Sequence, residues 1–249
     1  QVSQIRKLIS QNVDVLIISP NEAVPITDVA VEAYRKGIPT IIHDRKIQSD
    51  EYTVSIGANN YNIGSAIGEY INGQLPPNSK ILEIWGLEGS SPAMERHDGL
   101  IDHLRSDKNF QVTQVFGKWH YNSAYDAVNR LATFADIDLV YAHNDVMALA
   151  ARDVIMKRDS VSGKRIRFIG IDGVYGDGAG LQAVADEKLE ASFQYPTGGA
   201  ISIQVAMQII NGEKVKKNYV LNTAILNRGN AKTILAQSEQ LNHYQKRIT

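Results

Sequence analysis

Seven polar, charged or aromatic residues follow apolar segments of this sequence or lie in the helical patterns that come next. They are Asp44, Arg45, Arg96, Trp119, Asn144, Asp172 and Gln194. A carboxylate accepts hydrogen bonds from hydroxyl groups, whereas arginine and asparagine donate them in fixed planes. An indole ring offers a flat apolar face on which a sugar ring can stack. Because charges of both signs are mixed, the set is suited to a neutral ligand rich in hydroxyl groups, such as a sugar.

Short apolar segments alternate with helical patterns along most of the chain. The pattern predicts strands at 13–20, 39–44, 53–59, 80–86, 111–117, 138–144, 165–173, 189–195 and 219–228. It predicts helices before residue 13, at 25–36, 62–74, 92–106, 122–135, 145–158, 178–187 and 197–211, and from about Asn230 onward. Strands that are apolar on both faces and separated by helices indicate parallel sheets covered on both sides. So many strands exceed one comfortable doubly wound sheet, so we expect two similar sheets, the second beginning after Pro76-Pro77-Asn78.

In this arrangement the seven residues are expected to lie near the carboxyl ends of the strands. In open parallel sheets, ligands bind beyond the carboxyl ends of the strands, so these side chains are expected to gather at one end of the sheets. Each residue also has a structural reading. Asp44 could cap a loop, Arg45 and Arg96 could form surface ion pairs, Asn144 could be the N-cap of the helix that follows, and Trp119 could fill a core. The residues alone leave both readings open.

Composition and motifs argue against several other classes of function. The 249 residues include 26 Lys and Arg against 27 Asp and Glu, so the formal net charge is −1 and no nucleic-acid partner is expected. The chain has no cysteine, which excludes disulfides, thiolate nucleophiles and cysteine-bound metals. Because GxSxG, HExxH and Walker A motifs are absent and the six histidines are scattered, we expect no enzyme activity, no catalytic residues, no metal and no cofactor. No apolar run approaches the roughly 18 residues that span a bilayer.

Six runs of sequence carry a resemblance to a known family. They are LIISPNEA (16–23), GIPTIIHDRK (37–46), SIGANNYNIG (55–64), GLEGSSPAMERHDGL (86–100), YAHNDVMALAA (141–151) and IGIDG (169–173). In this order they resemble the type I periplasmic binding proteins, the ribose-binding group in particular, and the cores of LacI-type repressors share the pattern. Each run alone is weak evidence, but the combination is specific and covers nearly the whole chain.

The resemblance implies two Rossmann-like lobes joined by three crossovers, with a sugar bound between them. The N-terminal lobe would comprise residues 1–58 and 197–223, and the C-terminal lobe residues 59–196 and 224–249. The family begins with a strand, a helix and a strand that precede the matching part of this chain, so the first lobe is expected to be incomplete. Residues 221–248 look like the sensor domains of bacterial hybrid two-component histidine kinases, in which the final helix leads toward a membrane segment.

The same resemblance implies ligand contacts for all seven residues. Asp44 and Arg45 would come from the first lobe, and Gln194 would lie near a crossover. The second lobe would supply Arg96, Trp119, Asn144 and Asp172. At the position of Trp119 the family holds an aromatic residue that is not always tryptophan.

These expectations together describe a periplasmic sensor. The domain would form the extracytoplasmic part of an inner-membrane protein, close on a ribose-like or fructose-like furanose, and signal to a histidine kinase as a homodimer. Two alternatives share the fold: a soluble sugar-binding protein of an ABC transporter, and a LacI-type transcription regulator core. An α/β enzyme is a further alternative, and turnover of the bound sugar would have to be observed to support it. The sequence flanking the domain would separate the sensor, the transport protein and the regulator.

Overall fold

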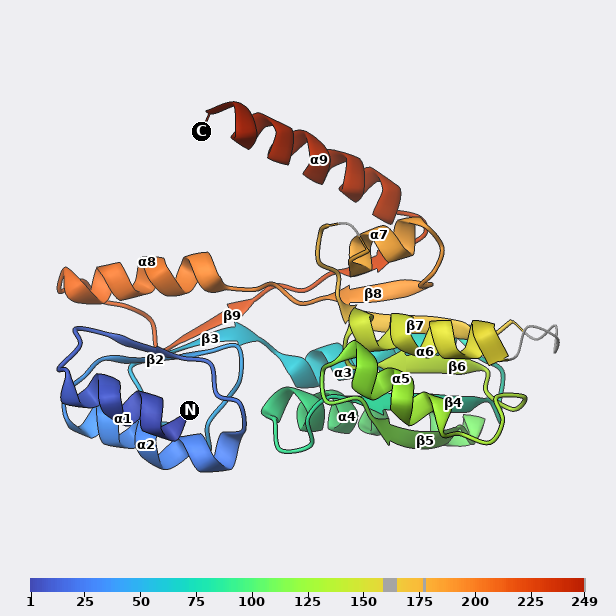
Figure 1. The fold of residues 1–249 in the computed structure, drawn as a ribbon, viewed down its shortest axis with the longest axis horizontal. Coiled ribbons are helices and arrows are strands. Elements are labelled where there is room, and N and C mark those ends of the chain that lie inside the picture. The colour runs from blue at the N-terminus through green and yellow to red at the C-terminus, as the bar shows by residue number, and fades with distance from the viewer. Residues whose placement is uncertain (159–164, 177, 249) are drawn as a thin grey trace. The chain divides into compact units, whose positions relative to one another are not determined.

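The computed structural model describes residues 1–158, 165–176 and 178–248, with side chains described up to residue 240 (Figure 1). The chain divides into two compact units. Unit 1 consists of residues 1–62, 89–98 and 196–222, and unit 2 of residues 63–88, 99–195 and 223–249. The sequence prediction had placed residues 89–98 in the second lobe. In the structure this segment is grouped with unit 1 because, for example, the Gly89 carbonyl accepts a hydrogen bond from Ala23 N–H at 3.2 Å.

Unit 1 is built on a four-stranded parallel sheet with the order β1-β2-β3-β9. Its strands are β1 (Leu16–Ile18), β2 (Thr40–His43), β3 (Val54–Ala58) and β9 (Asn218–Leu221). Its helices are α1 (Val2–Ser10), α2 (Ala23–Arg35) and α8 (Gly199–Ile210). Helices α1 and α2 share a core with Ile42, whereas α8 shares one with Ile41. Because successive strand residues point to opposite faces, the helices cover both sides of the sheet.

Unit 2 contains a six-stranded sheet with the order β10-β8-β7-β6-β4-β5, parallel except for the β10–β8 pair. Its strands are β4 (Lys80–Trp85), β5 (Gln111–Phe116), β6 (Leu139–Ala142), β7 (Arg167–Asp172), β8 (Ala191–Gln194) and β10 (Ile225–Asn227). Its helices are α5 (Tyr121–Asn129), α6 (Asp145–Arg158), α7 (Gly180–Ala185) and α9 (Ala231–Ile248). Residues of α3 (Asn60–Gln74) and α4 (Ser91–His103) are divided between the two units.

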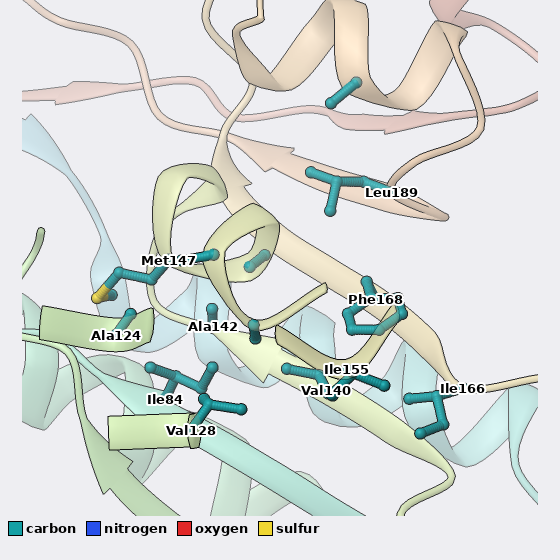
Figure 2. Packing of buried hydrophobic residues seen from close by; sticks show 14 of the residues in the cluster. Ile84, Ala124, Val128, Val140, Ala142, Met147, Ile155, Ile166, Phe168 and Leu189 are labelled. Carbon is teal, nitrogen blue, oxygen red and sulfur yellow. The ribbon is translucent and has the colours of Figure 1, made fainter. Parts of the chain in front are cut away.

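An extensive apolar core lies within unit 2, between the sheet and helices α5 and α6 (Figure 2). Ile84 of β4 and Val140 of β6 pack there with Val128 of α5 and Ile155 of α6, and all four side chains are buried. Fully burying one such side chain contributes about 1.5–3 kcal/mol relative to leaving it exposed. The β-branched runs that predicted these strands are therefore the same residues that fix the helices against the sheet.

The predicted architecture of two parallel-sheet lobes is confirmed, and two predicted elements are corrected. The single long strand expected at 219–228 is two strands, β9 in unit 1 and antiparallel β10 in unit 2. It is interrupted because residues 222–224 carry the chain from one sheet to the other. The helix expected at 122–135 ends at Asn129, where the backbone N–H of Arg130 closes the last turn.

An ion-pair cluster joins α3 to the amino ends of β7 and β8. Glu190 Oε2 accepts a hydrogen bond from Arg167 Nε at 2.6 Å, and Glu190 Oε1 accepts one from the Tyr70 hydroxyl at 2.6 Å. Partial burial acts to raise the pKa of the Glu190 carboxyl, but the hydrogen bonds from Arg167 and Tyr70 outweigh it and the pKa is lowered. The folded state therefore favours the ionised carboxylate.

We expect this cluster to make stability depend on acidity. A carboxyl group whose pKa is lowered by folding stabilises the protein above the pKa of the unfolded chain, and that contribution is lost as pH falls. The free energy of unfolding should decrease below pH 4.5, the ordinary value for glutamate, as pH falls through the lowered pKa of Glu190. Urea unfolding measured from neutral pH down to about pH 3 should show a weaker acid dependence in Glu190→Gln. The exposed Glu213→Gln is the control, and equal acid dependence in both variants would refute the assignment.

Candidate functional site

In unit 1, Asp44 and Arg45 directly follow β2 at its carboxyl end. Asp44 Oδ2 lies 3.8 Å from Arg45 Nε, and Arg45 Nη1 donates a hydrogen bond to the Asn21 carbonyl at 2.6 Å. The guanidinium is thus tied to the backbone that follows β1. Both side chains also line a hollow of about 230 Å³, together with Tyr52 and Asn59 among others. They border open space and are not packed into the core.

Arg96 lies in α4 and is 4% exposed. Its Nε donates a hydrogen bond at 2.9 Å to Oδ1 of Asn60, the first residue of α3, which is itself 2% exposed. The reading of Arg96 as part of a surface ion pair is therefore wrong. Burying a guanidinium costs free energy unless its N–H groups donate hydrogen bonds. The side chain is therefore held in a defined position, and its N–H groups require acceptors.

In unit 2, Asn144 connects a helix cap to Trp119. Its Oδ1 accepts the Met147 N–H at 2.9 Å and caps α6, as the structural reading predicted. Its Nδ2 donates at 3.3 Å to the carbonyl of Trp119, so both halves of the amide hold the local structure. The amide nitrogen carries a second hydrogen, so the capping role does not exclude contact with a ligand.

Trp119 is half-buried and packs against the edge of the unit 2 core. Its ring lies directly over Gly86, where an added Cβ would be 2.1–2.3 Å from three ring atoms. The glycine after β4 therefore makes room for the indole at the carboxyl end of the sheet. Trp119 is partly core, as one reading predicted, but part of its surface stays accessible.

Asp172 and Gln194 are the last residues of β7 and β8 and are paired in the strand register. Asp145 holds both strand ends in place. Its Oδ2 accepts hydrogen bonds from Gly173 N–H at 2.7 Å and from Ser192 Oγ at 2.9 Å. Asp145 is not among the seven residues predicted from the sequence, because nothing local shows that this carboxylate reaches two other strands.

Backbone conformation separates three of the seven residues from ordinary strand ends. Asp44, Trp119 and Asp172 have φ values of +66°, +70° and +116°. Positive φ is uncommon for residues other than glycine and unfavourable for a bulky side chain such as tryptophan. Strained residues of this kind gather at binding and catalytic sites, where the surrounding structure holds them in position. No feature of the sequence indicated this strain.

The structure thus brings the seven residues into groups within each unit. Asp44 lies beside Arg45, Trp119 is bonded to Asn144, and Asp172 is paired with Gln194, whereas Arg96 is bonded to Asn60. These groups offer carboxylate acceptors, planar donors and an aromatic face. Within the described part of the chain, no group of three His, Asp or Glu side chains is placed to hold a metal ion. None of the described helices is long and apolar enough to cross a membrane.

Comparison with known proteins agrees with this fold. Residues 1–214 match the model of the periplasmic binding protein domain family. The ribose import binding protein of Bacillus subtilis is 31% identical over 221 residues, covering 87% of this chain and 70% of that protein. The corresponding protein of Escherichia coli K12 is 28% identical over 223 residues, covering 88% of this chain and 73% of its own length.

Solved structures extend the likeness to nearly the whole chain. The fructose-binding periplasmic domain of a hybrid two-component system superimposes with a TM-score of 0.92 and 39% identity, covering 99% of this chain and 82% of that one. A Mycobacterium smegmatis protein in complex with β-D-fucofuranose gives a TM-score of 0.83 and 26% identity, covering 96% and 81%. This chain therefore belongs to the family of periplasmic binding protein domains, with the type I, ribose-binding-like fold.

Proposed function

We propose that this domain is the extracytoplasmic sugar sensor of a two-component system: it closes on a monosaccharide and signals to a membrane-attached histidine kinase. The observation that carries the proposal is the likeness to the fructose-binding domain of a hybrid two-component system, at 39% identity over 99% of the chain. The domain acts by binding and does not transform its ligand, as expected for relatives that are named as binding proteins.

The proposed ligand is a monosaccharide in a furanose form, with fructose and ribose as the leading candidates. Relatives are named for ribose and fructose, and one is bound to a fucofuranose. Carboxylates of Asp44 and Asp172 would accept hydrogen bonds from hydroxyls, and Arg96 would donate them. Trp119 would stack on the apolar face of the sugar. The full proposed set is Asp44, Arg45, Arg96, Trp119, Asn144, Asp172 and Gln194.

Contacts inside unit 2 offer a route from the ligand residues to the C-terminal helix. Gln194 N–H donates to the Ala224 carbonyl at 2.7 Å, next to β10, and the Leu226 side chain of β10 packs beside Gly173. Leu226 shares the unit 2 core with Ile234 and Leu235 of α9. A ligand biases a conformational equilibrium only through its different affinities for the two states. In this proposal the sugar favours the closed state, and β10 passes the change to α9 and to a partner subunit.

A second candidate, a soluble sugar-binding protein of an ABC transporter, has its own support. The curated relatives at 31% and 28% identity are ribose import binding proteins. The two functions predict different behaviour of the encoded protein. A sensor should change the autophosphorylation of an attached kinase when sugar is added, whereas a transport protein should restore sugar uptake to a strain that lacks its own binding protein.

A thermal-shift panel of monosaccharides tests the proposal. A ligand that binds only the folded state stabilises it by about 2.7 kcal/mol at 100 times its Kd. For a domain of this size we expect Tm to rise by roughly 5–10 °C with the correct sugar. D-fructose, D-ribose, L-arabinose and D-galactose form the panel, with D-mannitol as an acyclic control. The proposal is wrong if no monosaccharide in the panel raises Tm more than mannitol does.

A further inference from the structure

Beneath Trp119 lies a buried ionisable pair that none of the proposed ligand contacts includes. His143 follows β6 directly, and Glu83 lies in the neighbouring strand β4. His143 Nε2 is 3.0 Å from Glu83 Oε1, and both side chains are 0% exposed. A buried pair of this kind contributes little to stability compared with apolar residues of the same volume. We therefore look for a role of this pair in positioning its neighbours.

Both ring nitrogens of His143 are occupied. The backbone N–H of Gly86 points to Nδ1 at 3.3 Å, so Nδ1 acts as the acceptor and the ring proton lies on Nε2. Nε2–H then donates to the Glu83 carboxylate. Because one nitrogen accepts and the other donates, neither rotation of the ring nor exchange of the tautomer preserves both bonds. The imidazole is held in one orientation.

This fixed imidazole lies among aromatic rings that include both tryptophans of the chain. Its centroid is 5.4 Å from Trp85, 5.2 Å from Tyr141 and 6.3 Å from Trp119. Gly86, which donates to the imidazole, is also the residue over which the Trp119 ring lies. The indole therefore rests on a surface formed by the ring of His143 and the backbone that this ring binds.

The backbone of Trp119 is secured from the same place. Lys118 and Trp119 both have positive φ, +53° and +70°, which is a strained pair of conformations for residues other than glycine. Asn144, the neighbour of His143, donates to the Trp119 carbonyl at 3.3 Å. Residues 143 and 144 thus hold both the ring and the main chain of Trp119.

We propose that His143, oriented by Glu83, is a positioning residue that sets the plane of the Trp119 ring and thereby the affinity of the domain for a sugar ring. The inference rests on the proposed function, since it assigns His143 to the stacking partner of the sugar. His143 itself does not touch the ligand. Its effect is transmitted through the contact with Trp119 and through the hydrogen bond to Gly86.

The test compares two substitutions of His143 in the protein as encoded by its gene. His143→Gln retains an oxygen that can accept from Gly86 and an N–H that can donate to Glu83, whereas His143→Leu removes both. Calorimetric titration with D-fructose, or with whichever sugar gives the largest thermal shift, should show at least a tenfold weaker Kd for His143→Leu. His143→Gln should stay within about threefold of wild type.

A spectroscopic readout separates positioning from loss of folding. In a Trp85→Phe background, Trp119 is the only tryptophan, so its fluorescence maximum and near-UV circular dichroism report its surroundings. We expect both signals to change in His143→Leu and to be kept in His143→Gln. Because His143→Leu leaves the Glu83 carboxylate without the histidine donor, the double variant Glu83→Gln/His143→Leu replaces the buried charge by a neutral amide and should show the same weakened binding.

The outcomes distinguish the inference from the function on which it rests. If wild type binds sugar and both His143 variants bind equally well, the inference is overturned and the function stands. It is also overturned if affinity falls while the Trp119 signals stay unchanged, or if His143→Gln loses as much affinity as His143→Leu. If wild type binds no monosaccharide at all, the proposed function itself has failed.

Discussion

Replacing Arg96 with alanine should weaken sugar binding by roughly 10-fold to 150-fold, which corresponds to the 1.5–3 kcal/mol of a hydrogen bond to a charged group. Arg96 is 4% exposed, so its guanidinium is already shielded from water in the protein without ligand. Its bond to Asn60 fixes the Nε side of the group at 2.9 Å. Without the guanidinium, a sugar hydroxyl would still lose its hydrogen bonds to water on binding but would gain no hydrogen bond from the protein in return.

Calorimetric titration of Arg96→Ala against Arg105→Ala measures this effect. Arg105 is exposed and pairs with Asp107 at 2.5 Å, so its replacement removes an arginine that is not among the proposed ligand contacts. A surface pair of this kind contributes about 0–1 kcal/mol, and we expect unchanged affinity in the control. Thermal unfolding of both variants shows whether Arg96→Ala remains folded. Equal sugar affinity in a folded Arg96→Ala variant would remove Arg96 from the site.

The second large effect is expected from Gly86→Ala. A Cβ at this position would lie 2.1–2.3 Å from Cζ2, Cη2 and Cε2 of Trp119, so the indole must move. The backbone of Gly86 does not have the positive φ that would make alanine strained, so the expected effect comes from the clash with the ring. If Trp119 stacks on the sugar, affinity should fall at least tenfold, because an aromatic contact contributes roughly 0.5–1.5 kcal/mol beyond its area burial and the displaced ring also obstructs the site.

A second glycine in the same chain provides the matched control. At Gly73, near the end of α3, an added Cβ has nothing within 4 Å. Gly73→Ala should keep the affinity of wild type and stabilise the helix by roughly 0.5–1 kcal/mol. Gly86→Ala should instead destabilise the protein by about 1–3 kcal/mol, as overpacked substitutions do. Wild-type affinity in Gly86→Ala, measured by the same titration, would show that the plane of Trp119 does not matter for binding.

The fold was largely predictable because its elements are local patterns. Runs such as TIIH and VYAH are apolar on both faces, and this property alone indicates strands buried in parallel sheets. The separation of β9 from β10 was not predictable, since residues 219–228 are continuously strand-like and only the crossing between sheets interrupts them. The alternation of apolar segments with helical patterns shows where the strands lie, but it does not show which sheet each strand joins.

The candidate site was predictable to the extent that it follows strand ends. Asp44, Asn144 and Asp172 were proposed because a strand ends beside each of them. The contacts of Glu83 with His143 and of Asp145 with Ser192 were not predictable, because these residues are distant in sequence and meet only in space. The positive φ values of Asp44, Trp119 and Asp172 likewise depend on tertiary contacts. Positive φ is uncommon for residues other than glycine, so the sequence did not indicate it.

The choice between structural and ligand-binding readings also depended on the structure. Asn144 proved to be a helix cap, and its amide nitrogen, which donates to Trp119, carries a second hydrogen, so the cap does not exclude a ligand contact. Arg96 proved to be buried, which removes the surface reading. In both cases the residue type suits either role, so the sequence alone could not supply this information.

Titration calorimetry of wild-type protein with D-fructose and D-ribose, beside D-mannitol, measures directly whether this domain binds a monosaccharide. We expect saturable binding of one monosaccharide per domain, no binding of the acyclic control, and at least tenfold loss of that binding in Arg96→Ala. Absence of measurable binding to any monosaccharide in the panel, or binding that is the same in wild type and folded Arg96→Ala, would contradict this expectation.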